Sequence, residues 1–277
     1  MTAPHNHLLE GSPRLHYLEW NPQASRTIVL LHGNSANAWW WEPLARAIAP
    51  EYRLLALDQR GHGDSEWTRP VAYSPANYVS DIERFVQHIA PNAEKPVVVG
   101  HSMGGLNVLA FARKHPESMR GVMAIDVAVT STRGRDRYLR RLKGLPMVTY
   151  PDLATAKARF RLMPNEGGIP EETLHEIAEK SLARTDEGRW TLKFDRESFL
   201  GGDGIEVAET IKEIRIPTML VRAEHSRIMT ADAAEQARAS NPNARLVTIA
   251  AAHHHVILEK PEEVARVIEE FAASLET

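Results

Sequence analysis

The chain has 277 residues, a formal net charge of −3 and no cysteine. This length suits one large domain, alone or with an insertion, that buries a substantial core. The charge argues against general binding to nucleic acids or anionic membranes. The missing cysteines exclude a disulfide framework, a thiolate metal site and a cysteine nucleophile, and they fit a reducing compartment.

The N-terminal residues contain no basic segment followed by an apolar one, so no secretion signal is visible. No apolar run approaches the roughly 18 residues that span a bilayer. We therefore expect a cytoplasmic protein that acts on a small molecule and binds neither membranes nor nucleic acid. The sequence does not indicate an oligomeric state.

Strand and helix patterns alternate along most of the chain. Predicted strands cover residues 14–20 (an edge strand), 27–32, 52–57, 95–99, 120–126, 216–221 and 244–249. Predicted helices cover residues 39–49, 75–89, 106–114, 231–239 and 261–275. This alternation indicates the α/β class, with a mostly parallel central sheet and helices on both faces.

The alternation stops between residues 127 and 211, where the sequence is polar, helical and broken by proline and glycine. We interpret residues 127–211 as an inserted helical lid over the carboxyl edge of the sheet, where open α/β sheets bind ligands. Residues 1–126 and 212–277 then form the core. A basic run from Arg133 to Lys143 is interpreted as the solvated face of a lid helix, with Tyr138, Leu139, Leu142 and Leu145 facing inward.

A G-x-S-x-G motif at residues 100–104 lies between the predicted strand 95–99 and a predicted helix. Small residues on both sides of Ser102 allow the tight strand-to-helix turn that exposes a serine hydroxyl, which gives Gly100 and Gly104 a steric role. The helix behind this turn directs its positive N-terminus at the same point. Ser102 is therefore the candidate nucleophile.

A second motif, His32-Gly33-Asn34, ends the buried strand 27–32. Gly33 lets the backbone turn sharply beside the nucleophile, and the next N–H group belongs to Asn34. We predict that the N–H groups of Asn34 and Met103 form an oxyanion hole, whose donors are each typically worth about 10²–10³ in rate.

Three consecutive histidines at 253–255 follow the last predicted strand and offer a base for Ser102. Consecutive histidines cannot all face one ion, and no pair of histidines and carboxylates has the spacing of metal ligands. We therefore expect neither a metal nor a cofactor.

Together with the loop at 58–65 and the Ile-Pro-Thr start of the strand at 216, these motifs resemble the α/β-hydrolase fold superfamily over nearly the whole chain. The resemblance implies an α/β-hydrolase fold with a helical lid, in which the 58–65 loop shapes the core. In that family the histidine usually stands five residues before the acid of an L-E-x-P segment. Glu259 occupies that acidic position, which identifies His254 as the base, with His253 and His255 as alternatives.

The acid departs from the common family pattern. The usual aspartate follows the strand at 216–221, and here Ser226 stands in its place. Some members carry the acid at the end of the strand after the nucleophile helix, where this chain has Asp126. We favour Asp126, because an aspartate ending a buried strand needs a partner such as His254. Glu224 and a Ser–His dyad without a carboxylate are the alternatives.

The resemblance implies a cofactor-free serine hydrolase that cleaves a carboxylic ester through an acyl-enzyme, with Ser102, His254 and Asp126 as the triad. A lactone, a thioester or a carbon–carbon bond would be cleaved by the same groups. Hydrolases of this fold that need a carboxylate nucleophile are disfavoured by Ser102. A slow-turnover ligand receptor of the same fold is the alternative of another class.

Overall fold

The computed structural model describes residues 3–89, 94–129, 133–199 and 207–275. Its centre is an eight-stranded sheet in the order β1-β2-β4-β3-β5-β6-β10-β11. The first three strands in this order pair antiparallel and the others pair parallel. The strands are β1 (His5–Leu9), β2 (Leu15–Trp20), β3 (Arg26–Leu31), β4 (Tyr52–Leu57), β5 (Val97–His101), β6 (Gly121–Ile125), β10 (Thr218–Ala223) and β11 (Ala244–Ile249).

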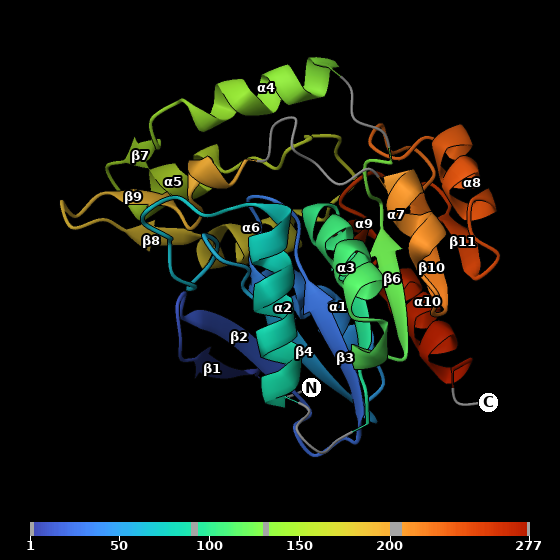
Figure 1. The fold of residues 1–277 in the computed structure, drawn as a ribbon. Helices are drawn as coiled ribbons and strands as arrows, with labels where there is room; N and C mark the ends of the chain where they lie inside the picture. The colour runs from blue at the N-terminus through green and yellow to red at the C-terminus, as the bar shows by residue number, and fades with distance from the viewer. Residues whose placement is uncertain (1–2, 90–93, 130–132, 200–206, 276–277) are drawn as a thin grey trace.

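Helices cover both faces of this sheet, as Figure 1 shows. One face packs against η1 (Ala38–Trp41), α1 (Glu42–Ala47), α9 (Val256–Glu259) and α10 (Pro261–Ala273). The other packs against α2 (Pro75–Ile89), α3 (Met103–Lys114), α7 (Val207–Glu213) and α8 (Ala231–Ala239), while the short η2 (Pro116–Ser118) follows α3. In β3, Ile28 and Leu30 enter the first of these cores and Val29 and Leu31 the second. A strand buried on both faces reads as a continuous apolar run, which is why the pattern was visible in the sequence.

The predicted α/β-hydrolase architecture is confirmed, and the differences are local. Residues 14–20 were predicted as an edge strand, but β2 is internal because β1 pairs with it on the outer side. Most of β1 is solvent-exposed and polar, so it carries no apolar signal. The predicted helix 39–49 is divided into η1 and α1, with the Asn37 side chain capping η1 and Pro43 opening α1.

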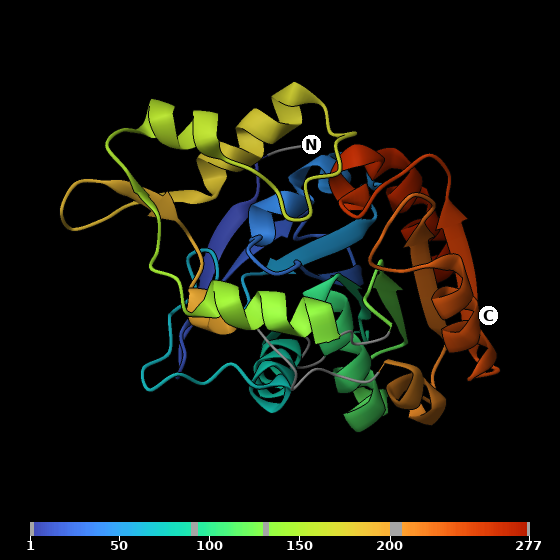
Figure 2. The ribbon, with the colours of Figure 1, turned by 90° about the horizontal axis from the view of Figure 1, so that it is seen from above.

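The insertion lies above the carboxyl edge of the parallel strands (Figures 1 and 2). It contains η3 (Arg196–Ser198), the helices α4 (Arg133–Lys143), α5 (Leu153–Arg159) and α6 (Glu171–Lys180), and a separate sheet. That sheet has the order β7-β9-β8, formed by β7 (Thr149–Tyr150), β8 (Leu182–Arg184) and β9 (Trp190–Leu192). The insertion is therefore not purely helical.

Two further features of the insertion differ from the expectation. Residues 207–211 were assigned to the insertion, but they lie in α7. This helix packs against α3 and buries Val207 and Ile211 in the core on that face of the central sheet. Tyr138 and Leu145, predicted to face inward, are 52% and 45% exposed. None of the helices in the described part of the chain combines the length and apolar character that crossing a bilayer requires.

Candidate active site

Ser102 lies on the sharp turn between β5 and α3, with φ 52° and ψ −118°. A positive φ is strained for any residue with a side chain and is typical of functional turns. The neighbouring glycines are sterically required, because a Cβ on Gly100 would lie 2.3 Å from the Gly104 carbonyl oxygen. One on Gly104 would lie 2.3 Å from the Leu31 carbonyl oxygen. The G-x-S-x-G motif thus lets α3 approach β3 closely while Ser102 remains partly exposed.

The loop after β11 brings His254 to this serine. Its Nε2 lies 3.1 Å from Ser102 Oγ, and its Nδ1 lies 2.7 Å from Asp126 Oδ2. These separations are those of a nucleophile, a base and an orienting acid. The His254 ring therefore lies between the Ser102 hydroxyl and the Asp126 carboxylate, where its Nε2 can accept the proton of the candidate nucleophile.

The other two histidines of the run point elsewhere. The His253 ring pairs with Glu259, with Nδ1 3.1 Å from Oε1, and the Glu259 carboxylate also accepts the His253 backbone N–H at 2.8 Å. The His255 ring donates from Nε2 to the Pro164 carbonyl of the lid at 3.0 Å. Of the three, only His254 contacts Ser102 within the described residues.

Asp126 follows β6 at φ 48° and is completely buried. Three donors satisfy its carboxylate: His254 Nδ1, the Ala223 backbone N–H at 3.0 Å and the Ser226 hydroxyl. A buried carboxylate needs such donors to stay ionised, because burial alone favours the neutral form. Glu224 is exposed and accepts the Ala251 backbone N–H at 2.8 Å, so it supports the histidine loop from outside.

Ser226 is the residue whose contribution the sequence did not reveal. It occupies the position at which the family pattern has an aspartate, and its hydroxyl donates to Asp126 Oδ2, the same oxygen that His254 contacts. Its oxygen also accepts the Ile228 backbone N–H at 3.0 Å. This contact between Ser226 and Asp126 depends on the proximity of the two strand ends, which no sequence pattern shows.

The two predicted oxyanion donors lie on either side of the nucleophile. Met103 opens α3, where a backbone N–H has no acceptor within the helix. Asn34 follows Gly33, at which a Cβ would lie 3.2 Å from the Ser102 Cβ. The Asn34 side chain lies 3.5 Å from Met103 Sδ, so the two residues are neighbours. Their joint action on an oxyanion stays a prediction.

Two buried histidines, His101 and His255, pack beside His254. Burial, together with the nearby His254, lowers the pKa of His101 to about 3. Burial likewise holds the pKa of His255 well below its usual range. His101 donates from Nε2 to the His254 carbonyl at 2.8 Å and so fixes the backbone of the base. Neither neighbour is then a cation that would oppose a positive charge on His254.

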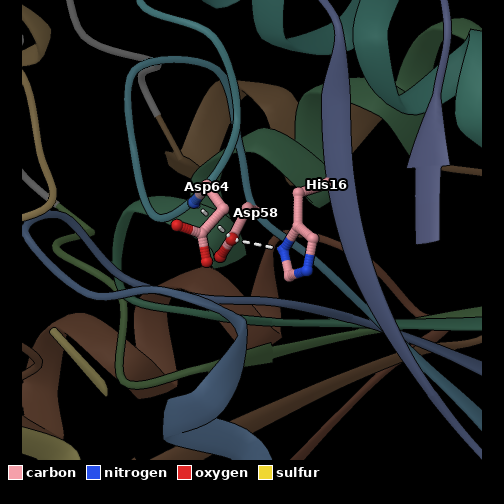
Figure 3. A group of neighbouring side chains, drawn as sticks. All are labelled: His16, Asp58 and Asp64. Atoms are coloured by element: carbon pink, nitrogen blue, oxygen red, sulfur yellow. Dashed lines mark hydrogen bonds and ion pairs between the residues drawn. The ribbon is translucent and has the colours of Figure 1, made fainter. Parts of the chain in front are cut away.

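A second polar group, His16, Asp58 and Asp64, gathers oxygen and nitrogen atoms within 4.8 Å of one another (Figure 3). The Asp58 carboxylate accepts hydrogen bonds from His16 Nδ1 at 2.7 Å, from the Asp64 backbone N–H at 2.8 Å and from the Ala38 backbone N–H at 2.6 Å. Burial would raise the pKa of Asp58, but these hydrogen bonds, chiefly from His16, keep it below its usual value. The Asp64 carboxylate lies 2.6 Å from Lys193 Nζ of the insertion. The group therefore ties β2, the 58–65 loop and the insertion together.

A model of the alpha/beta hydrolase family matches residues 28–267. The 2-(acetamidomethylene)succinate hydrolase of Mesorhizobium japonicum is 26% identical over 248 residues, which cover 88% of this chain and 87% of that protein. Esterase Rv0045c of Mycobacterium tuberculosis is 23% identical over 91% of this chain and 84% of its own length. A crystal structure of E-2-(acetamidomethylene)succinate hydrolase superposes with a TM-score of 0.84 at 23% identity, covering 98% of this chain and 99% of the other.

Proposed function

This chain belongs to the alpha/beta hydrolase family, and we propose that it is a serine hydrolase that cleaves a carboxylic ester through an acyl-enzyme. The observation that carries the proposal is the hydrogen-bonded series from Ser102 through His254 to Asp126, at 3.1 Å and 2.7 Å. Curated relatives named as esterase and hydrolase are consistent with it.

Acylation begins when Ser102 Oγ attacks the ester carbonyl carbon and His254 Nε2 takes the hydroxyl proton. Asp126 holds the imidazole with Nδ1–H toward its carboxylate and stabilises the imidazolium. The backbone N–H groups of Asn34 and Met103 would stabilise the negative oxygen of the tetrahedral intermediate. The intermediate then collapses, the carbon–oxygen bond to the alcohol breaks, and His254 returns its proton to the leaving oxygen.

Deacylation repeats these steps with water. His254 accepts a proton from the water molecule, the resulting hydroxide attacks the acyl carbonyl, and the bond to Ser102 Oγ breaks as Oγ regains the proton. Every proton passes through His254, so the protein is restored after one turnover and needs no cofactor for this chemistry.

The test is a set of p-nitrophenyl esters of increasing chain length, run beside lactones and thioesters. We expect Ser102→Ala to lower kcat by at least about 10³ on every substrate that the wild type cleaves, because the nucleophile is lost. Ser80→Ala, on the exposed side of α2, is the matched control and should retain the wild-type rate.

Three outcomes separate the alternatives. A preference for thioesters or lactones would leave Ser102 as the nucleophile but would show that the substrate is not a simple ester. Stoichiometric acylation without turnover would identify a ligand receptor. Full activity of Ser102→Ala would overturn the proposal.

A further inference from the structure

A cavity of about 120 Å³ lies between the Asn34 loop and the insertion. Its walls are mainly apolar, with Trp40 on the core side and Phe160, Phe194 and Phe199 on the insertion side. The helix α4, which crosses above α3 in Figure 2, contributes Leu142. The cavity has room for several water molecules or a short carbon chain.

This cavity is connected to the Ser102 site through the Asn34 loop. Asn34 forms part of its wall, and the adjacent Gly33 passes so close to Ser102 that a Cβ there would be 3.2 Å from the Ser102 Cβ. The Asn34 amide also lies 3.5 Å from the Ser198 carbonyl oxygen of η3. One end of a substrate held at Ser102 would therefore enter the cavity beneath η3.

Two guanidinium groups, Arg161 and Arg196, line the same cavity. Within the described residues, the Arg196 side chain makes no hydrogen bond or ion pair, and its Nε is buried without a partner. Arg161 donates only to the main-chain carbonyls of Ala158 and Phe160, at 3.0 and 2.6 Å. The neighbouring Glu197 carboxylate lies 3.5 Å from Lys143 Nζ.

Two other arginines of the described residues, the buried Arg60 and the half-buried Arg53, have carboxylate partners. Arg60 lies 2.5 Å from Asp81, and Arg53 lies 2.6 Å from Glu19. Arg196 is half-buried in an apolar wall without a counter-ion, which is less favourable than a paired guanidinium, and an anion bound beside it offsets that cost. Arginine is the side chain best suited to hold a carboxylate, because its two N–H groups match the two oxygens.

We infer that the substrate of the Ser102 site carries a second, ionised carboxylate, which Arg196, assisted by Arg161, binds in this cavity. The inference rests on the proposed serine-hydrolase function and names its substrate class: monoesters of short dicarboxylic acids. The aromatic walls contact the methylene chain, and the arginines bind the carboxylate at its far end.

The experiment compares two p-nitrophenyl esters that differ only at that end. One is the monoester of glutarate, and the other is 5-methylhexanoate, in which an isopropyl group replaces the carboxylate. Rates are corrected for hydrolysis without protein. We expect the wild type to prefer the glutarate ester in kcat/KM, and Arg196→Met to lower this preference at least about tenfold, mainly through KM.

Arg161→Met should lower the preference less, because Arg161 is exposed, and Arg196→Lys should retain part of it because the charge remains. Arg140→Met is the matched control: Arg140 is an exposed arginine of the insertion that does not line the cavity. It should leave the preference within about twofold of wild type, because exposed charges are screened. Equal loss in Arg140→Met and Arg196→Met would overturn the inference, since only the general charge of the insertion would then matter.

A binding measurement separates failure of the inference from failure of the proposed function. Glutarate is titrated into the Ser102→Ala variant, which needs no turnover, and into the same variant carrying Arg196→Met. We expect glutarate to bind the first and to bind the second at least about tenfold more weakly. Absence of binding, or equal preference for the two esters in an active wild type, would overturn the inference and leave the serine-hydrolase function standing. Glutarate binding without hydrolysis of any ester would overturn the proposed function alone.

Discussion

The adjacent parallel strands β6 and β10 both end beside His254, yet they supply different groups. At the end of β6 stands Asp126, a buried carboxylate with a positive φ. After β10 come the exposed Glu224 and the buried hydroxyl of Ser226. The two ends are joined, because the Asp126 N–H donates to the Val221 carbonyl at 2.7 Å and the Ala223 N–H donates to Asp126 Oδ1 at 3.0 Å.

In the proposed mechanism, the triad acid is therefore specified by a point in space and not by a particular strand. Hydrogen bonds join the ends of β6 and β10 and hold the Asp126 carboxylate beside His254. Ser226, which follows β10, reaches the same carboxylate oxygen that His254 contacts. In the proposed triad, Ser226 is a hydrogen-bond donor that stabilises the Asp126 carboxylate.

The largest effect is expected at the end of β6. Asp126→Asn should lower kcat by up to about 10⁴, because a neutral amide neither fixes the tautomer of His254 nor stabilises the imidazolium. The matched change at the end of β10, Glu224→Gln, should cost less than about twofold, because Glu224 accepts only a backbone N–H. Steady-state kinetics of the two variants, with circular dichroism to confirm folding, would reverse our assignment if Glu224→Gln were the more damaging.

Moving the acid between the strand ends is a stricter test. In the Asp126→Asn background, Ser226→Asp should recover about tenfold in kcat, because position 226 already contacts the oxygen that His254 contacts. In the wild-type background the same substitution should lower kcat, because two adjacent carboxylates favour protonation of one. Loss of further activity in the double variant would contradict the equivalence of the two strand ends.

The donor role of Ser226 gives a smaller effect. Ser226→Ala should lower kcat about tenfold, because a hydrogen bond to a charged group is worth about 1.5–3 kcal/mol. Ser226→Thr keeps the hydroxyl and should restore most of the activity, provided that thermal unfolding shows both variants folded. Similar rates for the alanine and threonine variants would show that packing at this position, and not the hydroxyl, is what matters.

His101, the last residue of β5, should make the stability of the fold depend on pH. Burial lowers the pKa of His101 to about 3, whereas an unfolded histidine titrates near about 6.5. Between about pH 3 and about pH 6.5, His101 is protonated in the unfolded chain but neutral in the folded protein. The contribution of His101 to the unfolding free energy is therefore complete above about pH 6.5 and declines as the pH falls toward about 3. Its slope is about 1.4 kcal/mol per pH unit.

Urea unfolding at pH 7 and pH 5 measures this slope. His101→Gln should reduce the loss of unfolding free energy on acidification by roughly the contribution of one proton. The exposed His175→Gln is the control and should leave the slope as in the wild type. Equal slopes for wild type and His101→Gln would show that His101 takes up its proton equally in both states.

The features predictable from the sequence are those with a local cause. Helix α2 and strands β4 and β11 have the predicted bounds, because their apolar periodicity and flanking residues lie within a few residues of each other. The edge strand β1 could not be predicted in this way. It is a strand because β2 offers it hydrogen bonds, and not because of its own polar residues.

The sequence alone was enough to predict Ser102 as the nucleophile, because the strand, the turn glycines and the helix around it are consecutive residues. The choice of His254 within the histidine run, and of Asp126 over Glu224, was left open by the residues themselves. His254 is 128 residues from Asp126 and 152 residues from Ser102 in the chain, and only the pairing of β5, β6, β10 and β11 sets which side chains meet. The cavity beside Ser102 depends on tertiary structure to an even greater degree. Arg161 and Arg196 line one cavity with Asn34 only because the insertion folds over the Asn34 loop, and no short-range pattern encodes a contact between segments so distant in sequence.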